Sequence, residues 1–423
     1  QIMIDLIALN HPDKHKRLQA LRDLLQQEKA QNDFPIQRPM DANNHIHTTY
    51  SFSPYSPSYA AYKAYRSGLT IAGIIDHDTL SGVHEFHEAC QILNIASTGG
   101  VEMRVKFDHG FGTINNPDQP NCMYMIAHGV PLSQVESFNS YLATYRKKRE
   151  LRNREMVHRL NRLWQSQGIS LDYDGDVRMR SKASEGGSVT ERHLLYALAV
   201  KLEERFGRTE ELIQIVESIF SVRASEKQRI WLKDSNNRIF LYDLLGLIKT
   251  NTATFFIPAS DEMPDAKEFV QTAKRFSAIP AYAYLGDVDV SVTQDKRAQH
   301  FEDRYLDQLV PALKAIGIPA IAYMPTRNTP MQLRRLQQLC RQYGLLEISG
   351  EDINSPRQGF HCEAYTNSDY HHLINSAWSL VGHEISLEND LEAGMFGTVF
   401  QHLSLNERIT LFSKIGQNTR RKL

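Results

Sequence analysis

The sequence predicts an α/β protein built on a parallel sheet or barrel. Two patterns carry this prediction. Short apolar segments alternate with amphipathic helical segments, and polar residues of the kinds that bind metals recur just after the apolar segments. With 423 residues, the chain is long enough for one large barrel with an inserted region, or for two to three ordinary domains.

The first part of the chain shows the alternation clearly. A leucine-rich amphipathic helix is expected at about 11–30, and further helices at 58–68 and 82–93. Apolar strands are expected at 69–75, at a short segment ending in 99–102, and at 122–127. At or just after the ends of these strands lie Asp76, His77, Glu102 and His128.

The pattern breaks at about 133–222, which is rich in Arg, Lys, Glu and Leu at helical spacing and predicts a helical insertion. The alternation then resumes. We expect strands at 255–257, 281–285, 318–323 and 345–348, and helices at 265–276, 300–316 and 330–343. We therefore divide the chain into an N-terminal helix (1–35), a first barrel part (36–132), the insertion (133–235), and a second barrel part with a C-terminal extension (236–423).

The candidate site lies at the strand ends. His45 and His47 are separated by one residue, so an extended backbone would point both rings to the same side. Active sites of α/β barrels gather at the C-terminal ends of the strands. We therefore expect six residues at one rim: His45, His47, Asp76, His77, Glu102 and His128.

Composition narrows the functional classes. The chain has 48 basic and 49 acidic residues, a balance that does not indicate a nucleic-acid partner or an anionic membrane. Its four cysteines lack Cys-x-x-Cys spacing, and no apolar run approaches the length of a membrane span. The N-terminal segment is charged and helical, unlike a signal peptide, so we expect a cytoplasmic protein.

Several segments together resemble the PHP family, the polymerase and histidinol phosphatase type of metal-dependent phosphoesterase. They are HIHT (45–48), GLTIAGIIDHDTLSG (68–82), GGVE (99–102), MIAHG (125–129), TERH (190–193) and YGLLEISGEDIN (343–354). The resemblance covers about Met40 to Phe360. It implies a distorted seven-stranded (β/α) barrel that holds up to three metal ions at its C-terminal rim, with inserted helices over the substrate.

The resemblance also implies a ligand set. The first metal would be bound by His45, His47, Glu102 and Asp352, and the second by Glu102 and His128. The family's remaining histidine of the second site is replaced at Ala283-Tyr284-Leu285. For the third metal, Phe52 and Asn354 stand where two ligands are expected and only His77 remains. We therefore expect one or two divalent ions, of zinc, manganese or iron, because imidazole and carboxylate ligands suit these metals.

Roles for other residues follow from their positions. We expect His77, Asp76 and Asp287 to be catalytic. Asp76 or Asp78 would orient a histidine, and Asp287 or Tyr284 would complete the second metal site. Thr190 is expected to cap a helix, which places Arg192 and His193 at a helix start suited to an anion. The resemblance makes this pair substrate-binding. Arg327 and Arg357 at later strand ends complete the expected substrate-binding set.

The implied activity is hydrolysis of a small phosphorylated metabolite or nucleotide by a metal-activated water. Two alternatives remain. The first is a degenerate relative that serves as a binding or regulatory protein, which the replacements at Phe52, Tyr284 and Asn354 favour. The second is a barrel amidohydrolase, which also begins with His-x-His but needs further histidines and usually a lysine at later strand ends.

Overall fold

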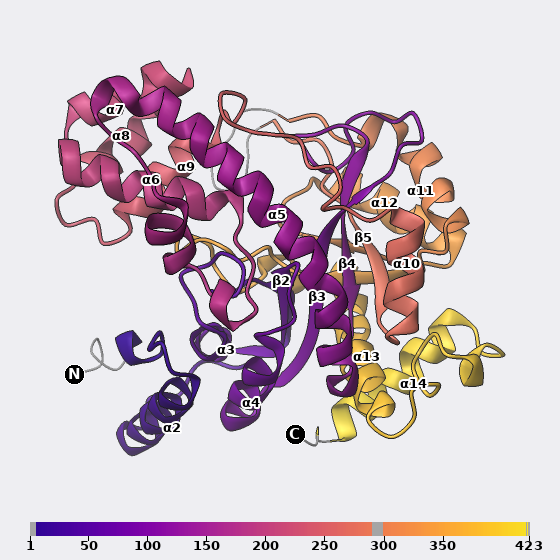
Figure 1. Ribbon diagram of the computed structural model, residues 1–423. Coiled ribbons are helices and arrows are strands. Elements are labelled where there is room, and N and C mark those ends of the chain that lie inside the picture. The colour runs from indigo at the N-terminus through magenta and orange to yellow at the C-terminus, as the bar shows by residue number, and fades with distance from the viewer. Residues whose placement is uncertain (1–5, 290–298, 420, 422–423) are drawn as a thin grey trace.

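The computed structural model describes residues 6–289, 299–419 and 421, and its centre is a seven-stranded sheet in which the strands follow one another in sequence order (Figure 1). The strands are β1 (Arg38–Ile46), β2 (Leu69–His77), β3 (Ala96–Lys106), β4 (Cys122–His128), β5 (Ile279–Ala283), β6 (Ala320–Tyr323) and β7 (Leu346–Ser349).

The sheet curls into a nearly closed barrel because the chain after β7 returns to β1. The His47 amide donates to the Ile353 carbonyl at 2.9 Å, and the Ile353 amide donates to the His45 carbonyl at 3.1 Å. The Asn44 side-chain amide adds a bond of 2.9 Å to the Ser349 carbonyl. The first two bonds join the segment after β7 to the end of β1, and the third joins the two strands themselves. The expected α/β barrel of seven strands is confirmed.

One strand runs against the expected direction. β4 is antiparallel to both β3 and β5, whereas the other neighbouring strands are parallel. His128 ends β4 and pairs with Ile279, the first residue of β5, so its backbone does not lie at the C-terminal rim as we had expected. The reason lies in the connection. Residues 107–121 form a loop without a helix, and parallel neighbours need a long crossover, whereas antiparallel neighbours do not.

Helices surround the barrel (Figure 1). In the first part of the chain they are α2 (Lys14–Gln31), α3 (Pro57–Arg66) and α4 (Val83–Leu93). In the second half of the chain they are α10 (Ala266–Arg275), α11 (Leu306–Ala315) and α12 (Pro330–Tyr343). The expected helix at 300–316 begins later, because a 3₁₀ turn at Asp303–Tyr305 precedes α11, and residues 290–298 of the acid-rich stretch before it lie outside the described residues.

Between β4 and α10, five α-helices contribute to a separate apolar core. They are α5 (Val135–Trp164), α6 (Glu191–Phe206), α7 (Glu210–Phe220), α8 (Glu226–Lys233) and α9 (Phe240–Lys249). The expected strand at 255–257 is wrong. Phe255 is a fully buried turn residue that packs in this helical core, and the apolar run reflects that burial. The domain boundaries remain a prediction.

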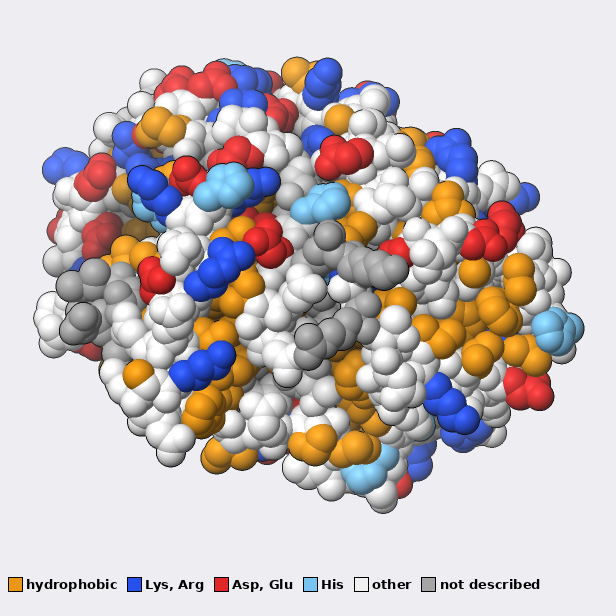
Figure 2. Space-filling model, turned by 90° about the horizontal axis from the view of Figure 1, so that it is seen from below, with side chains coloured by type: hydrophobic (Ala, Val, Ile, Leu, Met, Phe, Trp, Pro, Cys, Tyr) orange, Lys and Arg blue, Asp and Glu red, His pale blue; other side chains and the backbone are white. Residues whose placement is uncertain are grey.

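The last helices close the lower end of the barrel. Leu380 of α13 (His372–Leu387) and Phe412 of α14 (Leu405–Asn418) belong to one apolar cluster with Ile279, Ala281 and Ile348 of the strands. Seen from below, the described surface mixes basic and acidic side chains, with apolar side chains in several separate patches (Figure 2). Among the described residues, no helix is both long and apolar enough to cross a membrane.

Candidate metal centre

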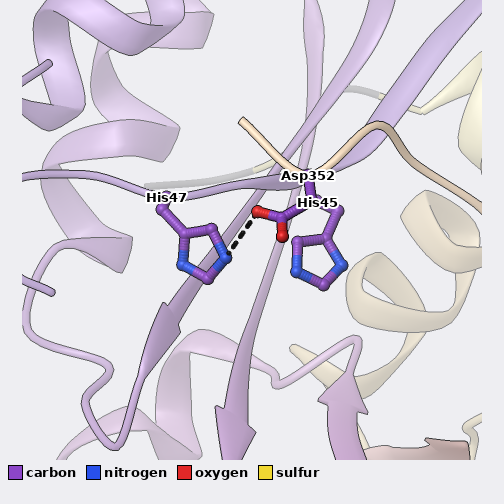
Figure 3. A group of neighbouring side chains, drawn as sticks. All are labelled: His45, His47 and Asp352. Atoms are coloured by element: carbon purple, nitrogen blue, oxygen red, sulfur yellow. Dashed lines mark ion pairs between the residues drawn. The ribbon is translucent and has the colours of Figure 1, made fainter. Parts of the chain in front are cut away.

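His45 and His47 stand at the end of β1, beside the segment that follows β7. Their ring centroids are 5.1 Å apart, and Asp352 lies between the two rings in Figure 3. Gly350 makes this approach possible, because a Cβ at that position would lie 2.7 Å from the His45 amide nitrogen. The close contact of the two segments brings Asp352 Oδ1 to 3.1 Å from His47 Nε2.

Glu102 of β3 joins the histidines into one cluster. Its Oε2 lies 3.5 Å from His45 Nε2, 3.6 Å from His47 Nε2 and 3.3 Å from His77 Nδ1. His77 also stacks on His47 with ring centroids 4.6 Å apart. The described residues thus form two groups that could hold a metal ion, His45–His47–Asp352 and His47–His77–Glu102.

The hydrogen bonding at the cluster fits a cation. The buried Nε2 atoms of His45 and His47 make no hydrogen bond within the described residues, although carboxylate oxygens lie close to both. Buried polar atoms rarely stay unpaired, and convergent imidazole and carboxylate ligands are the preferred set of zinc and related metals. The site therefore fits a divalent transition metal.

Asp76 holds His47 through a serine. Asp76 Oδ1 accepts hydrogen bonds from the Thr48 amide at 2.7 Å and from Ser51 Oγ at 2.6 Å. Since the single Ser51 hydroxyl proton is used on Asp76, the 3.4 Å contact with His47 Nδ1 requires that nitrogen to be the donor. In the neutral ring, His47 Nε2 then keeps its lone pair for a metal. Asp76 thus lies behind the ligands, and the relay through Ser51 gave no signal in the sequence.

The charges in the cluster reinforce one another. Burial disfavours the charged carboxylate of Asp352, but His47, His45 and Arg192 hold its pKa well below the usual range. Burial likewise opposes a charged His45, yet Glu102 raises the pKa of this ring above its ordinary value. For His77, burial, His47 and Arg149 together keep the pKa well below the ordinary value, so this ring is neutral at pH 7.

His128 reaches the same interior from the antiparallel strand. It lines a small cavity of about 50 Å³ together with His45, Glu102, Asp352 and Tyr284. Both of its ring nitrogens are buried without a hydrogen-bond partner in the described residues, and burial lowers the pKa of the ring to about 3. A neutral imidazole with free nitrogens is a competent metal ligand, although His128 is outside the two tighter groups.

The positions of the missing ligands are filled in other ways. Phe52 packs against His193 with ring centroids 5.0 Å apart, and also contacts Tyr196 and Tyr242 of the insertion. The Tyr284 hydroxyl donates to Asp303 at 2.7 Å, so this side chain has a partner in its own loop.

Arg192 and Asn354 connect the insertion to the cluster. Arg192, in the first turn of α6, donates from Nη1 to Asn354 Oδ1 at 2.6 Å. The Asn354 amide in turn donates to Asp352 Oδ1 at 2.7 Å. Arg192 therefore lies at a helix start, as expected, and is linked to Asp352 through Asn354, while its substrate-binding role remains a prediction.

The other expected residues lie elsewhere. His193 completes the capping box of α6 by accepting the Thr190 amide at 3.0 Å. Arg357 pairs with Asp243 through two bonds of 2.6 and 2.8 Å and stacks on Trp231. The Asp287 carboxylate accepts the Phe301 amide at 2.6 Å, and Arg327 donates to the Leu285 carbonyl. None of these four belongs to the two groups of candidate ligands in the described residues, and their functional roles remain predictions.

Comparison with known proteins supports the fold. No family model matches the chain. Over 149 residues, 35% of the chain, the sequence is 28% identical to a 5'-3' exoribonuclease of Haemophilus influenzae, and the aligned stretch spans 47% of that protein.

Two solved structures share the architecture. One, from Bifidobacterium adolescentis, has been assigned as a metal-dependent phosphoesterase. It aligns with a TM-score of 0.50 and 20% identity over 79% of this chain and 96% of its own. The other is an amidohydrolase from Chromobacterium violaceum with bound sulfate and no metal. It aligns with a TM-score of 0.51 and 15% identity over 75% of this chain and 89% of its own. Both confirm the barrel fold expected from the PHP resemblance.

Proposed function

We propose that the chain is a metal-dependent phosphoesterase that hydrolyses a small phosphorylated metabolite or nucleotide. One observation supports this proposal most strongly. His45, His47, His77 and Asp352 converge around Glu102, and Arg192 of α6 lies beside this cluster. A divalent metal bound there would polarise a phosphoryl oxygen and lower the pKa of a coordinated water.

The chain's own residues supply the rest of the site. His45, His47, Glu102 and Asp352 hold the first metal, and His128 adds a ligand for a second ion. Arg192 donates from Nη1 to Asn354, and its Nη2 makes no hydrogen bond within the described residues, so this nitrogen can bind a phosphate oxygen. Hydrolysis adds water across the phosphorus–oxygen ester bond. The products are a phosphate and the alcohol of the substrate.

The test combines metal analysis with a phosphoester screen. The native protein is expected to retain about one or two zinc, manganese or iron ions and to release phosphate from at least one phosphomonoester. His47→Ala, which removes a ligand shared by both groups, should lose both properties. A native protein that holds metal but turns over no phosphoester would reject the proposal and favour a binding or regulatory role.

A second substrate class is favoured by the likeness to the exoribonuclease. The same centre would cut the phosphodiester at the 5' end of an RNA strand, and a short 5'-phosphorylated RNA included in the screen tests this directly. The amidohydrolase likeness adds a third class, which N-acyl substrates in the same screen would reveal. We expect the cytoplasm as the location.

A further inference from the structure

The helical insertion is fastened to the barrel by a buried network of charges beside the metal centre. Arg149 and Arg152 of α5 both contact Glu191 at 2.5 Å, and Arg104 of β3 lies 3.4 Å from the same carboxylate. Glu262 receives Arg152 at 2.7 Å and Arg104 at 3.4 Å.

A sixth residue links this network to the strand that carries His77. Asp78 pairs with Arg149 at 2.5 Å, and its backbone amide donates to the Glu102 carbonyl at 3.0 Å. The network therefore holds three arginines and three acids, and every one of these side chains is at least four-fifths buried. Buried pairs of this kind fix geometry because breaking one leaves an uncompensated charge.

Glu191 is the centre of the network and immediately precedes Arg192. Both residues belong to the first turn of α6, where Thr190 and His193 form a capping box. The start of this helix is also held from outside, since Asn153 of α5 donates to the Val189 carbonyl at 2.7 Å and the Ser188 amide donates to the Tyr50 carbonyl at 2.7 Å.

From these contacts we infer that Glu191 is a positioning residue. Its ion pairs with Arg149 and Arg152 hold Arg192 in place near the metal ligands. Among the described residues, the hydrogen bonds and ion pairs of the Glu191 side chain go to arginines and not to the metal ligands. Glu191 acts by fixing the helix turn from which Arg192 reaches Asn354 and the phosphate. This inference rests on the proposed phosphate-binding role of Arg192.

The ion pairs of Glu191 also affect the charge of its neighbour, Arg192. Arg192 must sit near Asp352 and His77 without being drawn into a pair with Glu191, its neighbour in the chain. Glu191 already pairs with three arginines, which balance its charge. Arg192 is left with Asn354, a neutral partner, and keeps its charge for an anion.

A double-mutant cycle tests the inference. Inorganic phosphate is the probe, and its affinity for the metal-loaded full chain is measured by calorimetry for the native protein, Glu191→Gln, Arg192→Ala and the double variant. We expect Glu191→Gln to weaken phosphate binding about tenfold, because a small displacement of a binding group has large effects. In the Arg192→Ala background the same change should have no further effect.

The matched control is Glu262→Gln, which disturbs Arg104 and Arg152, two of the three arginines that contact Glu191, but is not adjacent to Arg192. It should lower the melting temperature as Glu191→Gln does while leaving phosphate affinity within about twofold of the native value. A purely structural role would give equal losses for both variants. If Glu191→Gln fails to fold, Arg149→Lys takes its place, since lysine keeps the charge but cannot contact Glu191 and Asp78 through two separate nitrogens as Arg149 does.

The outcomes separate this inference from the proposed function. Losses that add in the double variant, or a native protein that does not bind phosphate, overturn the positioning role. If the native protein binds phosphate and the cycle is non-additive, the inference stands even where no phosphoester is turned over. On any substrate found in the screen, Glu191→Gln should raise KM and leave kcat nearly unchanged, because metal and water are untouched.

Discussion

Individual residues decide which ligands are ready to bind a metal. The pair His45 and His47 could be identified from the sequence because alternation along an extended chain fixes their common side. The partner that orients His47 could not, because Ser51 belongs to an irregular loop whose path depends on Asp76 of another strand. A pattern in one segment carries no information about contacts that only the fold creates.

This relay gives the first prediction. Ser51→Ala removes the acceptor for His47 Nδ1 and the link to Asp76, so metal affinity should fall about tenfold, the lower end of what outer ligands contribute. Competition with a chromogenic chelator measures the change. Ser53→Ala, in the same loop, is the control and should bind metal as the native protein does. An unchanged affinity in Ser51→Ala would show that the relay has no influence.

A second prediction at this scale concerns Glu302. Its carboxylate is fully buried, and burial raises its pKa to about 7. The folded protein therefore binds this proton more tightly than the unfolded chain. The stability that protonated Glu302 adds to the free energy of unfolding is present below about pH 4.5 and is lost as the pH rises to about 7. Glu302→Gln can still accept the bonds from Tyr282 and Leu285 and carries no charge.

The measurement is urea denaturation at several pH values. The native protein and Glu302→Gln should have similar free energies of unfolding at pH 5, and the variant should be more stable at pH 8 by on the order of 3 kcal/mol, the scale of a shift of two to three pKa units. Equal pH dependence in the two proteins would contradict the assignment.

Secondary-structure elements were predicted best where periodicity is strong. The helix expected at 11–30 is found as α2, and 330–343 is found as α12 with the same limits. The direction of β4 was missed because an apolar run has no polarity of its own. The last seventy residues carry little motif signal, yet α13 and α14 close the barrel, since their contacts depend on small residues whose role appears only after folding.

The contact between these two helices supplies the third prediction. A Cβ at Gly382 of α13 would lie 1.9 Å from the Phe412 carbonyl oxygen of α14, so Gly382→Ala must push the helices apart and should cost about 1–3 kcal/mol. Gly246→Ala in α9 is the control, because apart from the backbone of its own helix no described atom lies within 4 Å of the new methyl group. That variant should gain up to about 1 kcal/mol from helix propensity. Thermal denaturation distinguishes the two, and a stabilised Gly382→Ala would refute the close packing.

At the scale of the whole molecule, the metal ligands come from segments that are far apart in the sequence. His45 lies near the end of β1 and His47 directly follows that strand, Glu102 lies on β3, and Asp352 follows β7. A metal held by these groups would therefore link β1 to β3 and to the segment after β7, where the barrel closes. The unfolded chain cannot present the same set of ligands together, so binding favours the folded state.

Metal removal is thus expected to lower stability as well as activity. At a free metal concentration about 100 times the dissociation constant, binding adds about 2.7 kcal/mol, so the chelated protein should melt a few degrees lower than the metal-loaded protein. His47→Ala loses a ligand of both groups, and its melting temperature should be the same with and without chelator. A native protein whose melting temperature ignores chelation would show that the cluster does not bind metal in the folded barrel. Its convergent histidines and carboxylates would then have to balance one another by protonation alone.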